Sequence, residues 1–519
     1  MKTNVFVDDN PLVDALVEKL ARSPATFKRD IIAIDEMYSY LIDELDDRNG
    51  DRALTFYYSM GRAILDTVKQ IADWHFGTFD NVGSFLDFAC GYGRFTRFLI
   101  EELPPERIWV SDIYKQAVKF QSEYFGVNGI VSTTIPEDYN VNQEFDFILA
   151  SSFFSHMPEQ TFESWMRQLY RLKSKSGLLL FSVLDADLLP PHVPMSEAGV
   201  LFSPASESQS LDKQEYGTTF VTETYVRRVL DRISDSKAKV YRLPKGLNRY
   251  QDLYAVSEGD AAPSTPPTFS HHPEGKIDYC YVQPDGKVSL SGWAVDFNAG
   301  ERVGEVQLWA GSRLLGTYPC SQERPDIAEH YRRPELLQSG WSCVLPPGEI
   351  SPQEILIIKI VNLAGWEAIV EADRLSSLAS RRAGEIQLTK TRAQLAQTRE
   401  QLGAIAQQYQ NQLSRIEGEW RRCQAECDAQ VAELERYRAA GEAQAAELER
   451  YRAAGEAQAA ELERRQQQMQ ATDDRIQIMD AQIQMLDNRI QAMGSSKFWK
   501  LRTKWFKLKR AIGLPANDE

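Results

Sequence analysis

Three short stretches in the first half of the chain combine residue types that suit a nucleotide-like ligand. The first, SFLDFACGYGRFTRFLIEEL at residues 84–103, runs from an apolar strand ending at Asp87 through small residues into a helix beginning near Arg94. Small residues let the backbone approach a ligand closely, and the free N–H groups of a helix start favour a polar or anionic group. This pattern predicts a ligand-binding turn between a strand and a helix.

The other two stretches are expected at the same edge of a parallel sheet. Asp112 ends the next predicted strand, where a carboxylate is placed to accept hydrogen bonds from ribose hydroxyls. Residues 144–157, EFDFILASSFFSHM, are typical of a fourth strand and its following loop, which lies at the ligand crevice of an open parallel sheet. NAD enzymes and many nucleotide binders share a glycine-rich turn, so only the order of all three stretches separates the alternatives.

That order resembles the class I S-adenosylmethionine-dependent methyltransferases over roughly residues 80–256. It runs from LDFACGYG through the acid of VSDI to FDFILASSFFSHMPE, a helix ending at Leu172, and GLLLFSV. Residues 250–257, YQDLYAVS, resemble the last, antiparallel strand of that family's sheet. The resemblance implies S-adenosyl-L-methionine as cofactor and no metal. The residues that it implies around the cofactor are Asp87, Ala89, Gly91 and Gly93 in the first turn, Asp112 at the ribose, and Ala150 and Ser151 after the fourth strand.

One position departs from the family pattern. The family's loop usually begins with glycine where this chain has Ala89. If that position needs a positive φ, the side chain of Ala89 strains the loop and changes the cofactor geometry. A domain that keeps only the fold is therefore the alternative to a cofactor-binding one.

His156 is the predicted catalytic residue. Methyl transfer from a sulfonium requires in-line alignment above all, and it needs a general base only when the acceptor must lose a proton. His156 follows the fourth strand, where the acceptor is expected, although it could instead cap or pack the helix start at Pro158. His192 is a second, weaker candidate for the same role.

Two other features near the site are assigned without a catalytic role. Residues 201–220, LFSPASESQSLDKQEYGTTF, are expected to form a lid over the acceptor, with Tyr216 and Gly217 as its most specific-looking positions. Cys90 has no Cys–His arrangement to support a nucleophile, so a small buried residue of the cofactor loop is expected there.

The surrounding patterns divide the chain into units. We expect an N-terminal helical extension at 1–79, a Rossmann-like domain with a parallel sheet at 80–257, a Pro- and Ser-rich linker at 258–275 and a small all-β sandwich at 276–374. The sandwich resembles accessory domains of bacterial multidomain surface-glycan enzymes around Trp293, Asp326 and Trp341. Its tryptophans could present a carbohydrate- or partner-binding face or fill the sandwich core.

The last third of the chain has a different pattern. One heptad frame runs from Leu388 with no proline before Pro515, and it predicts a long α-helical coiled coil over 381–494 and hence self-association. The sequence AELERYRAAGEAQA occurs twice in tandem from Ala432, and a third copy begins at Ala460. Cys423 and Cys427 fall at core positions of the frame.

A basic amphipathic helix is expected at 495–514, before a short tail at 515–519. Its apolar side carries aromatic and aliphatic residues, and no acidic residue occurs between Lys497 and Leu514. Such a segment favours the surface of an anionic membrane, with a protein partner and nucleic acid as the alternatives.

Composition restricts the class of protein. The net charge of -15 argues against general nucleic-acid binding. No run approaches the roughly 20 apolar residues of a membrane-spanning helix, and the acidic N-terminus lacks the apolar core of a signal peptide. The six cysteines have no metal-ligand spacing, so we expect the reduced thiols of a cytoplasmic protein. The terminal basic helix would make this protein peripheral on the cytoplasmic membrane face.

These features together predict an S-adenosylmethionine-dependent methyltransferase. The parts resemble those of surface-polysaccharide enzymes, so the specific hypothesis is O-methylation of a sugar or glycan near the cytoplasmic membrane face. Two alternatives stay open: a small-molecule or protein methyltransferase whose coiled coil serves only for oligomerisation, and a non-catalytic coiled-coil scaffold. The intact Asp87, Gly91, Gly93 and Asp112 speak against the scaffold.

Overall fold

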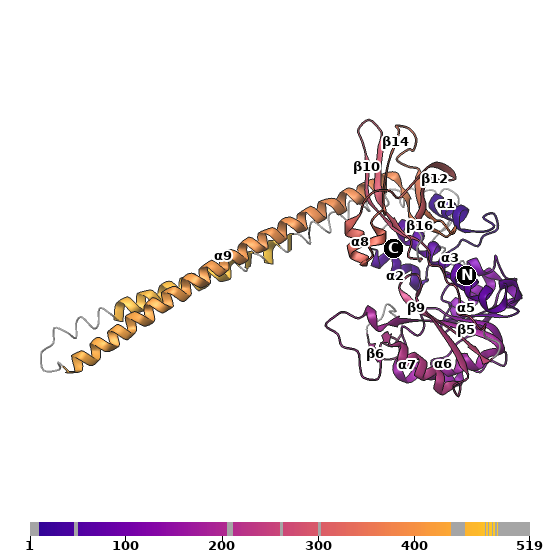
Figure 1. The fold of residues 1–519 in the computed structure, drawn as a ribbon, viewed down its shortest axis with the longest axis horizontal. Helices are drawn as coiled ribbons and strands as arrows, with labels where there is room; N and C mark the ends of the chain where they lie inside the picture. The colour runs from indigo at the N-terminus through magenta and orange to yellow at the C-terminus, as the bar shows by residue number, and fades with distance from the viewer. Residues whose placement is uncertain are drawn as a thin grey trace, which may run out of the picture. The chain divides into compact units, whose positions relative to one another are not determined.

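The protein divides into two compact units, Met1–Ala379 and Ser380–Glu519 (Figure 1). The computed structural model describes residues 10–45, 50–204, 211–259, 263–298, 303–436 and 452–472, and then 474–475, 477–479, 481–482 and 485. Within these residues no helix combines the length and the apolarity that crossing a membrane requires. The predicted basic helix at 495–514 and the tail at 515–519 lie outside the described residues.

The first unit is built on a mixed sheet, nine-stranded in the described residues, with the order β3-β2-β1-β4-β5-β7-β6. Strands β1 to β5 are parallel, while β9 runs antiparallel to β5 and pairs with β8. This confirms the predicted parallel sheet with an antiparallel last strand. The strands are β1 (Phe85–Phe88), β2 (Ile108–Asp112), β3 (Asn128–Val131), β4 (Phe145–Ala150), β5 (Lys173–Asp185), β6 (Val200–Ser203), β7 (Thr218–Val221), β8 (Ala238–Leu247) and β9 (Gln251–Glu258).

Helices cover both faces of this sheet because its central strands are apolar on both sides. Phe85 and Phe147 pack with α1 and α3 in one buried cluster, whereas Leu86, Phe88 and Ile148 pack with α6 and α7 in another. Neighbouring residues of a strand point to opposite faces, so this alternation produces three layers. The helices are α1 (Pro11–Leu20), α2 (Glu36–Glu44), α3 (Asp51–Phe76), α4 (Thr96–Leu99), α5 (Lys115–Phe125), α6 (Glu159–Leu172) and α7 (Glu223–Ile233).

A hairpin of β6 and β7 joins the sheet at the end of β5. Strand β5 is 13 residues long, and its last two residues pair with β7, at Leu184↔Phe220 and Asp185↔Val221. The hairpin is tied to the loop after β4, since Thr219 N donates to Ser155 O at 2.7 Å and Thr219 Oγ1 to Met157 O at 2.7 Å. These bonds bring residues 211–217 next to His156.

Two small antiparallel sheets follow and share a core, which confirms the predicted β-sandwich. Trp341, 1% exposed, fills that core with Leu290, Val306 and Ile358, and Trp293 is partly buried against a smaller cluster. The sheet orders are β10-β11-β14 and β13-β12-β15-β16. The elements are β10 (Glu274–Val282), β11 (Val288–Val295), β12 (Val303–Ala310), β13 (Arg313–Tyr318), α8 (Pro325–Tyr331), β14 (Gly340–Leu345), β15 (Ile355–Asn362) and β16 (Glu367–Arg374).

The chain continues into a long helix, α9 (Leu375–Arg436), and residues 452–472 are helical as well. The predicted long helix is therefore confirmed over these residues. The second stretch lies alongside α9 in Figure 1, and a Cβ built on Gly455 would lie 3.6 Å from Trp420 Nε1. Part of the predicted heptad frame on α9 is thus in contact with a second helical segment of the same chain. Association between chains stays a prediction.

Candidate functional site

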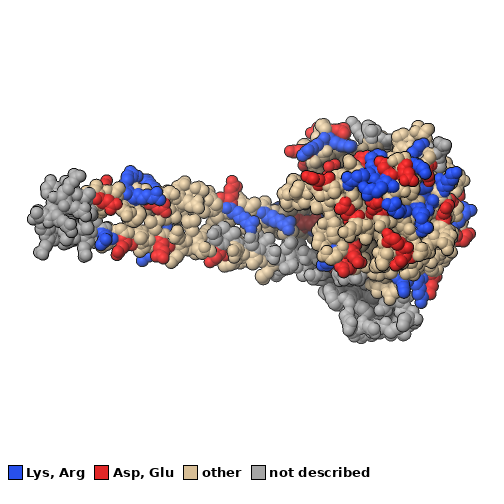
Figure 2. Space-filling view, turned by 90° about the horizontal axis from the view of Figure 1, so that it is seen from below, with Lys and Arg blue, Asp and Glu red and all other residues tan. Residues whose placement is uncertain are grey.

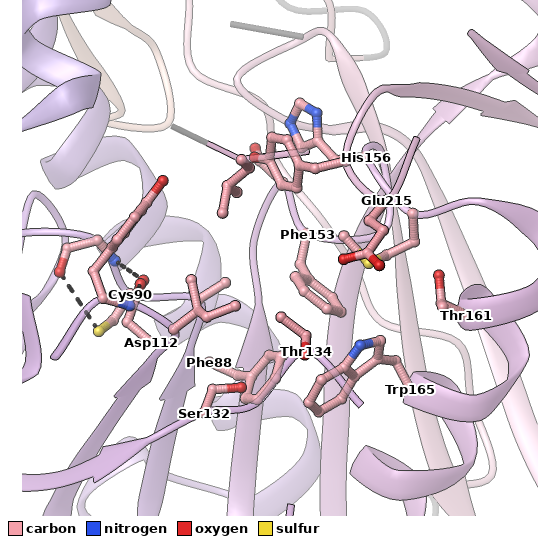
Figure 3. A pocket seen from close by; sticks show the side chains of 18 of the residues that line it. Phe88, Cys90, Asp112, Ser132, Thr134, Phe153, His156, Thr161, Trp165 and Glu215 are labelled. Atoms are coloured by element: carbon pink, nitrogen blue, oxygen red, sulfur yellow. Dashed lines mark hydrogen bonds between the residues drawn. The ribbon is translucent and has the colours of Figure 1, made fainter. Parts of the chain in front are cut away.

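A cavity of about 580 Å³ lies where the carboxyl ends of the parallel strands meet (Figure 3). Open parallel sheets bind their ligands in this position. Loops after four strands line it, and the lining residues from them are Phe88 to Tyr92 after β1, Asp112 to Tyr114 after β2, Ser132 to Glu137 after β3, and Ser151 to Phe153 with His156 to Pro158 after β4. All three stretches singled out in the sequence therefore meet at one cavity.

The turn after β1 is held in left-handed backbone conformations. The φ angles are 58° at Ala89, 54° at Gly91 and 85° at Gly93. Ala89 thus has the positive φ that glycine adopts more easily, and the departure from the family pattern is a strained position. The chain tolerates this strain because Cys90 N donates to Ser111 O of the neighbouring strand at 3.1 Å, which fixes the turn.

The carboxylate of Asp112 accepts hydrogen bonds from two backbone N–H groups, one of which belongs to that turn. Its Oδ2 accepts from Gly91 N at 2.8 Å and its Oδ1 from Tyr114 N at 2.9 Å. Burial raises the pKa of the Asp112 carboxyl, while these backbone N–H groups lower it. Each carboxylate oxygen has a second lone pair, so the group can still accept hydrogen bonds from a ligand in the cavity.

Three of the predicted cofactor residues lie outside the cavity lining. Asp87 is 3% exposed and accepts from Thr96 Oγ1 at 3.1 Å, and burial raises its pKa to about 7. A Cβ on Gly93 would lie 2.4 Å from the Phe125 ring, so this glycine permits close packing against α5. Ala150 is buried at the end of β4. These three residues pack next to the cavity without lining it. The other four predicted cofactor residues, Ala89, Gly91, Asp112 and Ser151, line the cavity.

The loop after β4 is fixed by a side-chain network. Ser152 has a φ of 55°, and its N–H donates to Ser182 Oγ at 2.7 Å. Ser182 Oγ donates to Gln251 Oε1 at 2.6 Å, and Gln251 Nε2 donates to Ser152 Oγ at 3.1 Å. Next to this network, Ser151 Oγ is buried with no hydrogen-bond partner among the described residues. Since unpaired buried hydroxyls are costly, Ser151 is a candidate for binding a ligand.

The aromatic side chains of Phe88, Phe153 and Trp165 form the apolar part of the site (Figure 3). Their rings pack edge to face or tilted, with centroids 4.9 Å apart for Phe88–Phe153, 5.1 Å for Phe88–Trp165 and 5.6 Å for Phe153–Trp165. Such contacts lock the side chains in place and give a flat ligand an apolar surface.

His156 lines the cavity and is held by the 211–217 segment. Its Nδ1 lies 2.7 Å from Gly217 O, and its ring stacks on Tyr216 with centroids 4.5 Å apart. A carbonyl oxygen only accepts, so Nδ1 donates this hydrogen bond, and in a neutral imidazole the lone pair is then on Nε2. This is the tautomer of a general base, and the stacking also satisfies the alternative packing role.

The structure supports no catalytic role for the other two candidate side chains, His192 and Cys90. His192 is exposed and does not line the cavity. Cys90 lines it, but burial raises the pKa of its thiol well above the ordinary value, and its Sγ lies 3.6 Å from Gly91 O. A thiol that stays protonated is a poor nucleophile, which agrees with the assignment of Cys90 as a small loop residue.

Several lining residues come from segments that sequence patterns did not connect with the site. Asp35, Glu36, Met37 and Tyr40 come from the start of α2. Asp212 and Glu215 also line the cavity, but they belong to the predicted lid segment 201–220. Asp35 is 1% exposed and accepts from Tyr57 Oη at 2.6 Å. Buried Arg97 ties this N-terminal part to the turn after β1 through Gly93 O at 3.0 Å and Asp30 O at 3.2 Å. Such long-range contacts leave no local spacing signal in residues 1–79.

Comparison with known proteins identifies the central part of the unit. Residues 86–179 match the family model described as a methyltransferase domain. A malonyl-[acyl-carrier protein] O-methyltransferase of Calditerrivibrio nitroreducens is 24% identical over 122 residues, which cover 24% of this chain and 45% of the relative. The match thus spans less than half of that relative's length.

Solved structures with a similar arrangement are distant in sequence. An S-adenosylmethionine-dependent methyltransferase from Clostridium acetobutylicum is 13% identical, with 43% of this chain and 98% of that chain covered and a TM-score of 0.30. Magnesium protoporphyrin IX methyltransferase from Synechocystis is 14% identical, with 38% and 83% covered and a TM-score of 0.26.

Proposed function

We propose that this chain transfers a methyl group from S-adenosylmethionine to an acceptor bound beside His156, because residues 86–179 match a methyltransferase domain. The observation that carries the proposal is the position of Asp112, held by Gly91 N–H at the mouth of the strained turn. No other described feature of the cavity combines a fixed carboxylate with closely approaching backbone at the ends of parallel strands.

The residues of the cavity fit the cofactor. Asp112 would hold the ribose hydroxyls, the backbone of Ala89 and Gly91 would approach the methionine part, and the unpartnered Ser151 hydroxyl offers a further hydrogen bond. The cavity volume of about 580 Å³ lies within the range of small-molecule sites. When bound, the cofactor supplies an electrophilic methyl group on a sulfonium.

The chain's own contribution would be alignment and proton removal. The aromatic surface of Phe88, Phe153 and Trp165 orients the acceptor, and an oriented pair of reactants removes much of the entropic barrier. His156 Nε2 would take the proton of an acceptor hydroxyl as the new O–C bond forms. The Gly217 carbonyl keeps the ring in the basic tautomer and stabilises the imidazolium that results.

Binding calorimetry with S-adenosylhomocysteine tests this proposal. Asp112→Ala removes a charge-assisted hydrogen bond, so its affinity should fall by about 10- to 150-fold, while Asp112→Asn, which keeps one acceptor oxygen, should lose less. Asp326→Ala, at an exposed aspartate of α8, is the control and should bind like wild type. Unchanged affinity in Asp112→Ala would refute the ribose assignment. No binding by wild type would refute the function.

We also propose, from the architecture, that the acceptor is a sugar or glycan near the cytoplasmic membrane face. One observation favours a carbohydrate-binding sandwich: Tyr279 and Tyr281 are both exposed on β10, with ring centroids 6.2 Å apart. The basic segment 495–514 would hold the protein on anionic lipid. Full-length protein should float with anionic liposomes, and a version ending at Gly494 should not. Equal flotation of the two would place the contact elsewhere.

Self-association through residues 381–494 is a proposal of the same kind. The heptad frame supports a parallel dimer or trimer, while the position of residues 452–472 alongside α9 supports a helical hairpin within one chain. Light scattering separates the two, because a hairpin leaves the mass at 59.1 kDa and a dimer doubles it.

A further inference from the structure

The cavity contains far more carboxylates than cations. Over the face of the first unit drawn in Figure 2, acidic and basic side chains are mixed. The cavity is different: among the described residues its only lysine or arginine is Arg94. Its carboxylate residues are Asp35, Glu36, Asp112, Glu137, Asp212 and Glu215. The cavity thus differs in charge from the face drawn in Figure 2.

Arg94 belongs to the cofactor side of the cavity. It follows Gly93 directly in the turn after β1, where the methionine part of the cofactor, which has its own carboxylate, is proposed to lie. Its Nη1 is 3.9 Å from Met60 Sδ of α3. Arg94 is therefore assigned to the turn and the cofactor end of the cavity.

The acceptor side offers no cation among the described residues. Its lining comes from α6 and from the loop before β7, which contributes Asp212, Gln214, Glu215 and Tyr216. In Figure 3 the carboxylate of Glu215 is drawn between Phe153 and Thr161, and all three residues line the cavity. Lys213 is in the same loop but does not line the cavity, and the sequence of residues 205–210 contains neither lysine nor arginine.

We infer that the acceptor is neutral or cationic where it enters this cavity, as a hydroxyl or amine compound is, and that carboxylate or phosphate acceptors are excluded. An anion there would lose hydration, meet Glu215 and find no counterion. An amine would gain both the carboxylate and the faces of the aromatic rings. This inference rests on the proposed function and assigns Glu215 as a residue that selects the acceptor by charge.

Matched sets of small ligands test the charge selection. Each set carries one scaffold with an amine, an alcohol or a carboxylate, for example tyramine, 4-(2-hydroxyethyl)phenol and 4-hydroxyphenylacetate. Binding to the full chain saturated with S-adenosylhomocysteine is measured by ligand-observed NMR titration. The carboxylate member should bind at least about tenfold more weakly than the alcohol, and the amine at least as tightly.

Two variants of one loop sharpen the test. Glu215→Lys should reverse the order, so that the carboxylate member binds best, while Lys213→Glu should keep the wild-type order. Carboxylates that bind wild type as well as the alcohols, an unchanged order in Glu215→Lys, or no binding by any scaffold would each overturn the inference. Calorimetry with S-adenosylhomocysteine is run on all three proteins. Its failure in wild type would overturn the proposed function instead.

Discussion

The two sides of the cavity are built in different ways. On the cofactor side, the carboxylate of Asp112 accepts hydrogen bonds from the backbone N–H groups of Gly91, in the turn after β1, and of Tyr114, and Asp112 is 7% exposed. On the acceptor side, His156 is held by a carbonyl 61 residues away, and Glu215 is exposed. The cofactor side is thus held mainly by backbone N–H groups. The acceptor side is an assembly of side chains that can change one at a time.

This contrast predicts where substitutions act on binding and where they act on turnover. Changes behind the turn should alter stability and cofactor affinity. Changes at the acceptor side should alter the reaction with little effect on the fold.

The largest effect is expected for His156→Gln. Loss of a general base lowers kcat by about 10²- to 10⁴-fold, whereas the affinity for S-adenosylhomocysteine should stay within about twofold. The measurement is a methyl-transfer assay with the best acceptor found in the charge-matched sets. His192→Gln is the control, because His192 is exposed and does not line the cavity. A kcat close to wild type in His156→Gln would leave this histidine with its packing role.

The sequence predicted the fold that carries the cofactor side because its signals are local. The parallel sheet and the antiparallel β9 were expected from short motifs, and strain at Ala89 was expected if the turn required a positive φ there. The acceptor side was predicted only in part. His156 and the segment around Tyr216 were singled out, without a role for Glu215 within it, and α2 was missed because long-range packing places it at the cavity. Trp341 illustrates the same limit, because a tryptophan in an alternating strand fits a core and a binding face equally well.

The next largest effect concerns Asp87 and pH. Burial raises the folded-state pKa of Asp87 to about 7, above its unfolded value, so the folded protein keeps a proton that the unfolded chain releases. The stability from this group is full at low pH and is lost as pH rises toward 7. One pKa unit corresponds to about 1.4 kcal/mol, so the loss across this window is on the order of 4 kcal/mol.

Asp87→Asn tests this linkage. The amide stays neutral in both states and its oxygen can still accept from Thr96 Oγ1. The variant should match wild type near pH 4 and be more stable than wild type near pH 7.5, as measured by urea unfolding without cofactor. A variant less stable than wild type at both pH values would show that Asp87 is ionised and held by interactions stronger than its burial.

A moderate effect is expected for Gln251→Leu. Gln251 holds the loop after β4, which contributes residues to both the cofactor side and the acceptor side of the cavity. The substitution breaks the network that fixes the left-handed turn at Ser152, and lost buried hydrogen bonds cost about 1 to 3 kcal/mol. Because the same loop carries Ser151 and leads to His156, both cofactor affinity and kcat should fall, each by about tenfold. Gln283→Leu is the matched control, since Gln283 Nε2 makes a similar bond to Ser289 Oγ at 3.0 Å in the sandwich. A change in unfolding free energy alone would confine Gln251 to a structural role.

The smallest effect is expected for Ala89→Gly, at the position where the turn after β1 departs from the methyltransferase pattern that it resembles. At a φ of 58° an alanine costs about 1 to 2 kcal/mol relative to helical backbone, and glycine removes that strain but adds about 0.4 to 1 kcal/mol of unfolded-chain entropy. The variant should therefore be more stable than wild type by up to about 1.5 kcal/mol, with equal or tighter binding of S-adenosylhomocysteine. Ala117→Gly is the opposite case, because Ala117 lies buried in the first turn of α5, where glycine costs about 1 kcal/mol. Opposite signs for the same chemical change would show that the turn after β1 is set by backbone conformation. Loss of stability in both variants would mean that the Ala89 methyl group contributes more through its contacts in the cavity wall than its φ angle costs.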